Sequence, residues 1–500
     1  MRVSRPLGIS AAAGPVRRIV ESPHYKWWVY FAIAIGMAGT VMDQSGVNIA
    51  IPRIADHFVA DIPTVQWVAL GYVLSTSAML LPAGRLSDMI GRKRVYLGGF
   101  VIFMAAAALG GSSQNFPVLI LAKVVQGIGA AGIQSNGMAI IADVFPDRER
   151  GKALGLYMAI IGTGSISGPI VGGLLVSGLG WRSVFFAGVP VSIVAMVAAW
   201  AVLKGGRPEG RAGSGPRSFD WAGASLSSAA LISFLLGMTN AYRMGWTSPP
   251  ILASFVIAFA LLAGFLWWEN RTADPMLDLT FFNSKVFSVG VAARSLSFLG
   301  SSAVFFLLPF YLIEGLGYPA SRAGLILVPG ALGMAITGPL SGRLSDKVGT
   351  RWPAVLGMAM SAAGMIIFSR LTIDSPAYHV IVGTILTGSG MGTFSSANTS
   401  AVLSSMTREK YGIVSAFVNV VRTSSNVTGV ALATTIVTFT MGSLGFEPSL
   451  AALADDGHEG VRGAFISGMN RAFLVGAGFA VAALALSVLR GESQGARLSG

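Results

Sequence analysis

Long apolar runs separated by short polar segments recur along the whole 500-residue chain. Each run approaches the roughly 20 residues that an α-helix needs to cross about 30 Å of hydrocarbon. The pattern predicts fourteen membrane-spanning helices, at 27–50, 63–83, 95–112, 117–142, 151–176, 183–203, 219–239, 251–269, 286–313, 319–341, 352–370, 377–403, 412–440 and 463–489. An even number of spans places both termini on the same side of the membrane.

The composition agrees with a chain that crosses a membrane repeatedly. Hydrophobic residues make up 53% of the sequence and charged residues only 11%, against about 25% charged residues in soluble domains. The mean hydropathy is +0.67. Glycine is abundant, at 64 residues, as expected where helices pack closely in lipid. We therefore predict an all-α polytopic membrane protein.

The net charge of +13 reports topology rather than a nucleic-acid partner. About 25 of the 35 Lys and Arg residues fall in the termini and in alternate loops, which is the positive-inside distribution. These basic loops are 85–94, 148–152, 204–217, 343–351 and 408–410. We expect them, and both termini, on the cytoplasmic side of the inner (plasma) membrane. The expected partner is the lipid bilayer, with no nucleic acid.

One segment occurs twice in the chain. Gly84–Gly91 reads GRLSDMIG and Gly342–Gly349 reads GRLSDKVG, each after an apolar run and each in a basic loop. Two homologous halves of like orientation follow, with the substrate path between them near the midplane. The predicted units are a cytoplasmic N-terminus 1–26, a six-helix bundle 27–203, a cytoplasmic linker 204–218, two inserted helices with a loop 219–285, a second six-helix bundle 286–489 and a cytoplasmic C-terminus 490–500.

Few charged residues lie inside the predicted spans, and each needs a reason, because a charge at the bilayer centre costs roughly 2.5 to 3.5 kcal/mol. They are Asp43, Lys123, Arg294, Arg422 and Arg471, with Glu314 near a helix end. Asp43 is the leading proton-coupling residue, because a carboxyl in a closed cavity can take up a proton and release it when water or substrate arrives. The alternatives are a hydrogen bond to Asn48 or to a partner helix, and a solvated place at the exterior mouth.

Lys123 and Gln126 lie one helical turn apart in the sequence. Both therefore project from one face of their helix, towards the bundle interior if the charge is to avoid lipid. An ion pair between Lys123 and Asp43 is one arrangement open to them. We place Lys123 with Asp43 in proton coupling, and Gln126 and Asn48 among the residues of a substrate cavity.

The remaining cavity candidates are cationic and aromatic. Arg294 and Arg422 either line the cavity of the second half or form buried structural pairs. Tyr157 and Phe298 are candidates for an apolar pocket with affinity for cations. For either ring taken alone, helix packing or lipid contact is the simpler interpretation.

Several kinds of chemistry are excluded by the sequence. Cysteine is absent, so disulfides and thiol nucleophiles are ruled out, and the four His are scattered through termini and loops, against a metal site. The GxGxxG pattern at Gly127–Gly132 lies inside an apolar helix and follows no strand, which rejects dinucleotide binding. No GxxxxGK[ST] phosphate loop occurs. We expect no metal, no cofactor and no enzymatic activity.

Four motifs together resemble those of a known family. They are DQSGVNIAIP at Asp43–Pro52, GRLSDMIGRKR at Gly84–Arg94, AKVVQGIGAAG at Ala122–Gly132 and GSISGPIVGG at Gly164–Gly173. The chain resembles the major facilitator superfamily over essentially its full length, and within it the fourteen-helix drug:proton antiporter group. The resemblance implies two six-helix bundles with two extra helices between them. Lys123 stands where that group has an Arg implicated in proton transfer.

The repeated loop and the fifth span also have a physical interpretation. Gly84 and Gly91 permit a tight turn, and Asp88 lies at a helix end with Arg85 and Arg92 beside it. Ion pairs at the cytoplasmic mouth would hold the halves together in one state and release them in the other; the gating residues are Gly84, Arg85, Asp88, Gly91 and Arg92, with Gly342, Arg343 and Asp346 in the repeat. The antiporter motif comprises Gly164, Gly168, Pro169, Gly172 and Gly173. Packing alone explains the glycines, and the resemblance adds antiport.

The expected function is secondary active transport of a small-molecule substrate. We expect a monomeric, proton-coupled antiporter that exports lipophilic or cationic drugs or toxic metabolites by alternating access, with protons as the second partner. Proton-coupled import or symport of one specific metabolite on the same fold is the alternative, because a fold does not fix a function.

Overall fold

A computed structural model describes residues 22, 24–59, 65, 67–146, 149–204, 219–272, 275–318, 320–407, 410–446 and 459–490. Most of the predicted termini and of the linker 204–218 lie outside these described residues. So do the side chains of Pro169 and Glu314.

Fourteen helices of at least 18 residues make up the described chain. They are α2 (Tyr25–Phe58), α4 (Trp67–Ile90), α5 (Arg92–Gly111), α6 (Phe116–Val144), α7 (Arg150–Leu179), α8 (Arg182–Val202), α9 (Trp221–Met244), α10 (Pro249–Glu269), α11 (Lys285–Phe310), α12 (Ala320–Val348), α13 (Arg351–Phe368), α14 (Ala377–Ser404), α15 (Tyr411–Ser443) and α16 (Glu459–Leu489). Two short elements, η2 (Leu279–Asn283) and η3 (Tyr311–Gly315), flank α11. The predicted all-α polytopic fold is confirmed.

Eleven of the described helices are long and apolar enough to cross a membrane. The other three, α2, α7 and α15, are also long enough for a span, at 34, 30 and 33 residues. Of these three, α7 and α15 contact helices of both halves of the chain, whereas α2 packs within the first half. Polar residues on such helices avoid lipid by facing protein. The count of fourteen spans stays a prediction.

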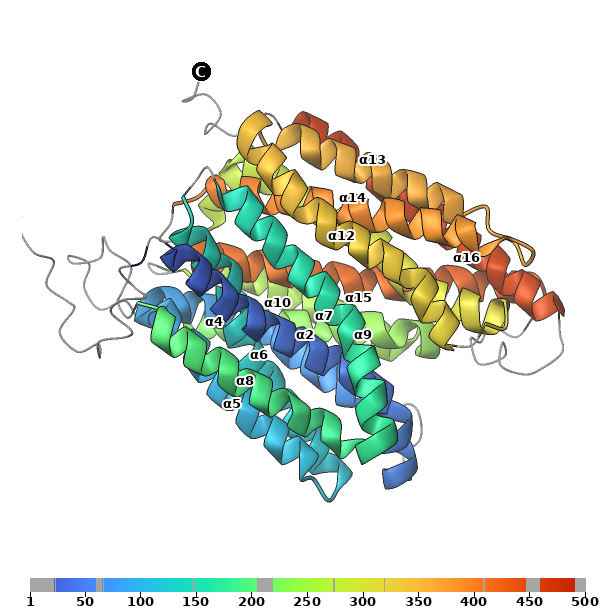
Figure 1. Ribbon diagram of the computed structural model, residues 1–500, viewed down its shortest axis with the longest axis horizontal. Helices are drawn as coiled ribbons and strands as arrows, with labels where there is room; N and C mark the ends of the chain where they lie inside the picture. The colour runs from blue at the N-terminus through green and yellow to red at the C-terminus, as the bar shows by residue number, and fades with distance from the viewer. Residues whose placement is uncertain are drawn as a thin grey trace, which may run out of the picture.

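The helices form two groups that meet along α7 and α12 (Figure 1). The first group comprises α2 and α4 to α8, and the second comprises α11 to α16. In Figure 1, α7 and α12 lie together at the upper left and diverge towards the lower right. They approach closely at two glycine pairs, Gly155 with Gly338 and Gly151 with Gly342, where the backbones meet because neither residue has a side chain.

The hairpin of α9 and α10 packs beside both groups. It contacts α4 of the first group and α15 of the second. Ser228 Oγ donates a hydrogen bond to the Ala78 carbonyl at 2.9 Å, and Trp246 Nε1 donates to Thr435 Oγ1 at 2.9 Å. The hairpin therefore touches helices of both groups at once.

The two GRLSD segments are not loops, as the sequence analysis expected, but the last turns of α4 and α12. The turn comes after them, at Gly91 (φ 104°) and Gly349 (φ 85°), where only glycine is free of strain. Gly84 therefore makes no turn. It lies inside α4, where a Cβ would meet the Ala416 side chain and, at 3.0 Å, the Gly412 carbonyl of α15. Its small size allows the two groups to approach.

Candidate functional site

The first part of the site is a buried triad of Asp43 on α2 with Lys123 and Gln126 on α6. Lys123 Nζ lies 3.5 Å from Asp43 Oδ2 and donates a hydrogen bond to Gln126 Oε1 at 2.6 Å. Gln126 Nε2 in turn donates to Asp43 Oδ2 at 3.0 Å. All three side chains are buried. The ion pair considered from the sequence is present, and Asp43 bonds a partner helix rather than Asn48.

Aromatic rings enclose the Lys123 ammonium. It lies 5.0 Å from the centre of the Tyr72 ring on α4 and 5.2 Å from that of Phe185 on α8, which is within cation–π range. The other carboxylate oxygen of Asp43, Oδ1, is buried and accepts no hydrogen bond. It faces Gly188 of α8, where a Cβ would lie 3.0 Å from it. Oδ1 is therefore the buried oxygen of the triad that has no hydrogen-bond partner.

The second part of the site is Arg294, on α11, which is fully buried. Its Nη1 donates to Thr399 Oγ1 of α14 at 2.8 Å, and its guanidinium lies 5.3 Å from the centre of the Phe298 ring. Its Nε and Nη2 are buried and have no hydrogen-bond partner. No carboxylate of the described residues pairs with it.

Arg422, on α15, lies where the two helix groups meet. Its Nη2 is 3.4 Å from Gln134 Oε1 of α6, and its Nε is 3.4 Å from Asn419 Oδ1. The phenols of Tyr72 and Tyr157 lie within electrostatic reach. Arg422 is half-buried, and again no carboxylate of the described residues pairs with it. The cavity candidates Arg422 and Tyr157 are thus brought together.

The third part of the site is the GRLSD face, the end of the protein that carries both repeated segments. Asp88, near the end of α4, accepts a hydrogen bond from the Ile413 amide at 3.0 Å. Ile413 lies in the first turn of α15, where backbone amides are free and the helix dipole favours a negative charge. Arg92 lies 3.7 Å from the same carboxylate and 3.3 Å from Asp143.

The same contact is repeated with the halves exchanged. Asp346, near the end of α12, accepts hydrogen bonds from the Gly151 amide at 3.0 Å and the Lys152 amide at 3.2 Å, in the first turn of α7. The Arg150 guanidinium lies 5.3 Å from the centre of the Tyr411 ring, which joins the starts of α7 and α15. Within the described residues, each Asp thus lies at the N-terminus of a helix in the other group. The ion pairs between the halves that the sequence predicted stay a prediction.

The protein is closed at the GRLSD face. Within the described residues, the hydrogen bonds between the two six-helix groups lie at this face or at the level of Gln134 and Arg422. Further along, Gly162 of α7 only touches the flexible Met334 side chain, at 3.4 Å for an added Cβ. Figure 1 shows the same trend, because α7 and α12 diverge with distance from the GRLSD face.

The glycines of the predicted antiporter motif pack α7 against α2. A Cβ on Gly164 would lie 3.2 Å from Val41, one on Gly168 would lie 2.8 Å from the Met42 carbonyl, and one on Gly172 would lie 2.8 Å from Gly46 Cα. Gly173 has nothing within 4 Å. The helix that carries Asp43 therefore lies directly on the helix whose first turn is capped by Asp346.

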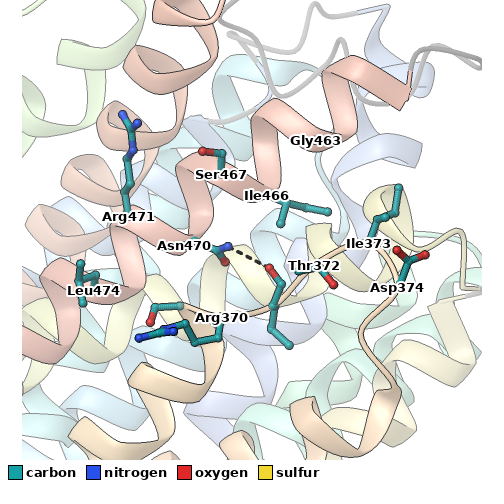
Figure 2. Close-up of a pocket in the computed structure, with 12 residues that line it drawn as sticks. Arg370, Thr372, Ile373, Asp374, Gly463, Ile466, Ser467, Asn470, Arg471 and Leu474 are labelled. Atoms are coloured by element: carbon teal, nitrogen blue, oxygen red, sulfur yellow. Dashed lines mark hydrogen bonds between the residues drawn. The ribbon is translucent and has the colours of Figure 1, made fainter.

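Several predicted residues are exposed or half-buried, among them two arginines of the GRLSD face. Asn48 is exposed, one turn beyond Asp43, and Arg343 is exposed on α12. Arg85 is half-buried. Arg471 is exposed too, and it lines a pocket of about 860 Å³ between α16 and the segment after α13 (Figure 2). Asn470 donates to the Leu371 carbonyl there, at 2.9 Å.

Gln134 and Thr399 were missed by the sequence analysis. Gln134 follows Gln126 by eight residues, a spacing that keeps two side chains on one helix face, so periodicity gave a usable signal. Thr399 lies in a run of small residues on α14 that has no such mark. No group of three His, Cys, Asp or Glu positioned for a metal ion occurs within the residues that the structure describes.

Two helix groups that close on one face around buried charges define a multi-pass membrane transporter. The chain belongs to the Major Facilitator Superfamily, whose family profile matches residues 33–430. This confirms the family expected from the motifs and the transporter, rather than enzyme, class.

Individual relatives agree with this assignment. The chain is 32% identical to the riboflavin transporter RibZ of Clostridioides difficile (strain 630), over 81% of this chain and 87% of that one. It is also 32% identical to the tetracenomycin C resistance and export protein of Streptomyces glaucescens, over 77% and 71%. Among solved structures, the human organic anion transporter MFSD10 (TETRAN) has the same fold, with a TM-score of 0.61 at 13% identity, over 95% of this chain and 100% of that one.

Proposed function

We propose that this transporter exports lipophilic small molecules, such as drugs or toxic metabolites, in exchange for protons by alternating access. The triad of Asp43, Lys123 and Gln126 is the observation that carries the proposal. Asp43 is a buried acid at the centre of α2, whereas every other Asp and Glu of the described residues lies in the first or last turn of a helix or between helices. An acid that is buried in the middle of a membrane-spanning helix is the natural proton carrier.

Proton uptake at Asp43 would remove the ion pair between Asp43 and Lys123. A proton on Oδ1, the oxygen without a hydrogen bond, removes the negative charge that faces the ammonium at 3.5 Å. The ammonium then keeps only Gln126 and two ring faces as partners. Contacts among α2, α4, α6 and α8 all depend on this balance, so protonation biases how these helices pack.

The glycine contacts offer a route from this site to the GRLSD face. α2 lies on the glycine face of α7, and the first turn of α7 is held by Asp346 of the other helix group. A shift of α2 that moves α7 as a rigid element would pull its amides from Asp346. Asp88 and Asp346 are then the gating residues, as expected from the repeat, and Gly84 and Gly342 allow the closed state.

The test is gradient-driven transport by the purified protein in liposomes. An imposed pH gradient should drive export of a lipophilic substrate, and added ATP should not. Asp43→Asn should reduce this transport by about 100-fold or more, the usual scale for loss of an essential proton-transfer group. Asp56→Asn is the matched control, because Asp56 is on the same helix but exposed, and it should leave transport unchanged. Full gradient-driven activity in Asp43→Asn would remove Asp43 from the mechanism.

The second candidate is transport of one specific metabolite, by import or symport. It is favoured by the similarity to RibZ, which carries the name of a riboflavin transporter. Right-side-out and inside-out vesicles distinguish the two, because export accumulates substrate only in the inside-out preparation when the gradient is oriented as in the cell.

The finer features expected from the sequence complete the proposal. We place the chain in the fourteen-helix drug:proton antiporter group, with α9 and α10 as the inserted pair and the unit boundaries given above. We orient the GRLSD face and both termini to the cytoplasm of the inner membrane, since about 25 of the 35 Lys and Arg residues lie on that side. We expect a monomer. Cysteine labelling from either side tests the orientation directly, because the natural chain has no cysteine.

A further inference from the structure

Buried charge at the centre of this protein does not balance. Lys123 is matched by Asp43 at 3.5 Å. Arg294 and Arg422, on α11 and α15, have no carboxylate partner among the described residues. They are also close enough to each other for electrostatic repulsion. The centre therefore carries two positive charges in excess.

Such an arrangement is costly unless something else neutralises it. A buried guanidinium is stable only when its donors and its charge are satisfied. Arg294 is fully buried, and two of its three nitrogens have no acceptor. Thr399 and the face of Phe298 satisfy only part of it, and neither carries a charge.

Arg422 is the more accessible of the two arginines. It is half-buried, and both of its neutral acceptors, Gln134 and Asn419, are at 3.4 Å, near the upper limit for a hydrogen bond. A carboxylate or sulfonate would bind a guanidinium through shorter, charge-assisted hydrogen bonds. The amides of Gln134 and Asn419 would be displaced at little cost. Phe298 and Tyr157 supply aromatic surface beside the two guanidinium groups.

We propose that the substrate is a lipophilic organic anion, an aromatic molecule with a carboxylate or sulfonate group that Arg294 and Arg422 bind together. This rests on the proposed transport function and narrows its substrate class. The sequence analysis expected cations among the substrates. Two unpaired guanidinium groups repel a cation, and Asp43, the acid that would attract one, is already paired with Lys123.

The test is equilibrium binding to the purified wild-type transporter, without a gradient. The probes are 8-anilinonaphthalene-1-sulfonate (ANS), an aromatic anion, and N-phenyl-1-naphthylamine, the same rings without the sulfonate. Ethidium serves as the lipophilic cation. We expect ANS to bind about tenfold or more tightly than either of the others, the scale of one charge-assisted hydrogen bond.

Variants then assign the binding to the two arginines. Arg294→Gln and Arg422→Gln should each weaken ANS binding by about tenfold and leave N-phenyl-1-naphthylamine unchanged. Arg294→Lys keeps the charge and should bind ANS more tightly than Arg294→Gln does. Arg271→Gln is the matched control, because Arg271 also lies over an aromatic ring, Trp267 at 4.3 Å, but is exposed just after the end of α10. If Arg294→Gln does not fold, Arg422→Gln carries the test alone.

The outcomes separate this proposal from the transport function. ANS binding no tighter than that of the neutral or cationic probe, or unchanged in both glutamine variants, overturns the anion proposal. Gradient-driven export of ethidium in that case leaves proton-coupled transport standing. Conversely, arginine-dependent ANS binding with no gradient-driven transport supports the anion site and overturns proton exchange.

Discussion

In the first helix group the buried cation Lys123 lies beside a carboxylate, whereas in the second group Arg294 and Arg422 lie without one among the residues that the structure describes. At the GRLSD face the same two groups are alike, since each places an aspartate at the first turn of a helix in the other. The GRLSD face is thus alike in the two groups, whereas the centre differs between them. In the mechanism proposed here, the repeated parts would serve the motion common to both halves, and the unlike parts would divide proton and substrate between them.

The largest expected effect tests the paired against the unpaired cation. Lys123→Gln leaves Asp43 as a buried charge without a counter-ion, and we expect a loss of about 3 to 5 kcal/mol in stability. Arg294→Gln leaves no carboxylate unpaired, so it should cost nothing or raise stability. Thermal unfolding of the purified variants, followed by tryptophan fluorescence, measures both. Equal losses in the two variants would contradict the comparison.

A smaller effect is expected at the gate, where the halves are alike. Asp88→Asn and Asp346→Asn each remove a carboxylate from a helix N-terminus, which is worth about 1 to 2 kcal/mol, or roughly tenfold in an equilibrium. Both should shift the protein towards a state open at the GRLSD face. Spin labels on Ile90→Cys and Val348→Cys, exposed positions at the ends of α4 and α12, report that opening as a longer distance.

The comparison of Asp88→Asn with Asp346→Asn tests whether the two halves contribute equally to the gate. Opening by both aspartate variants supports a gate shared by the halves. Opening by one only would show that the gate, like the centre, is asymmetric.

The smallest effect concerns the turn that ends the GRLSD segment. Gly91 has φ 104°, so Gly91→Ala should lose about 1 kcal/mol through backbone strain. Gly98→Ala is the control, because Gly98 lies within helix α5 with nothing within 4 Å of an added Cβ, and it should gain about 0.5 to 1 kcal/mol. Thermal unfolding distinguishes the two signs. A stabilising Gly91→Ala would mean that the turn is not strained.

The helices were predictable because spans in lipid have a strong signal, and most predicted ends fall within a few residues of the observed ones. The GRLSD segments were placed wrongly, as loops, because charged and polar residues normally end a span. In this fold their Asp residues need the rigid end of a helix to reach the amides of Gly151 and Ile413. The length and hydropathy of a span do not predict such a contact between two helices.

The charged residues of the centre were named from the sequence, but not their pairing. Asp43, Lys123 and Gln126 are drawn together across two helices, α2 and α6, 83 residues apart along the chain for Gln126 and Asp43. Whether Arg294 has a carboxylate partner depends on which helices pack against it. The periodicity of the sequence does not predict that packing. Helix packing therefore determines whether a buried arginine belongs to a structural ion pair or to the proposed anion site.

The central claim is that one carboxyl moves a proton while two arginines hold an anion, and the charge moved per substrate tests it most directly. Export of one monovalent anion against one entering proton moves about two elementary charges in the same electrical direction. In liposomes whose potential is set with valinomycin and potassium, an inside-negative potential should accelerate ANS export, with about two charges moved per ANS. ANS export that is indifferent to the potential would contradict the account.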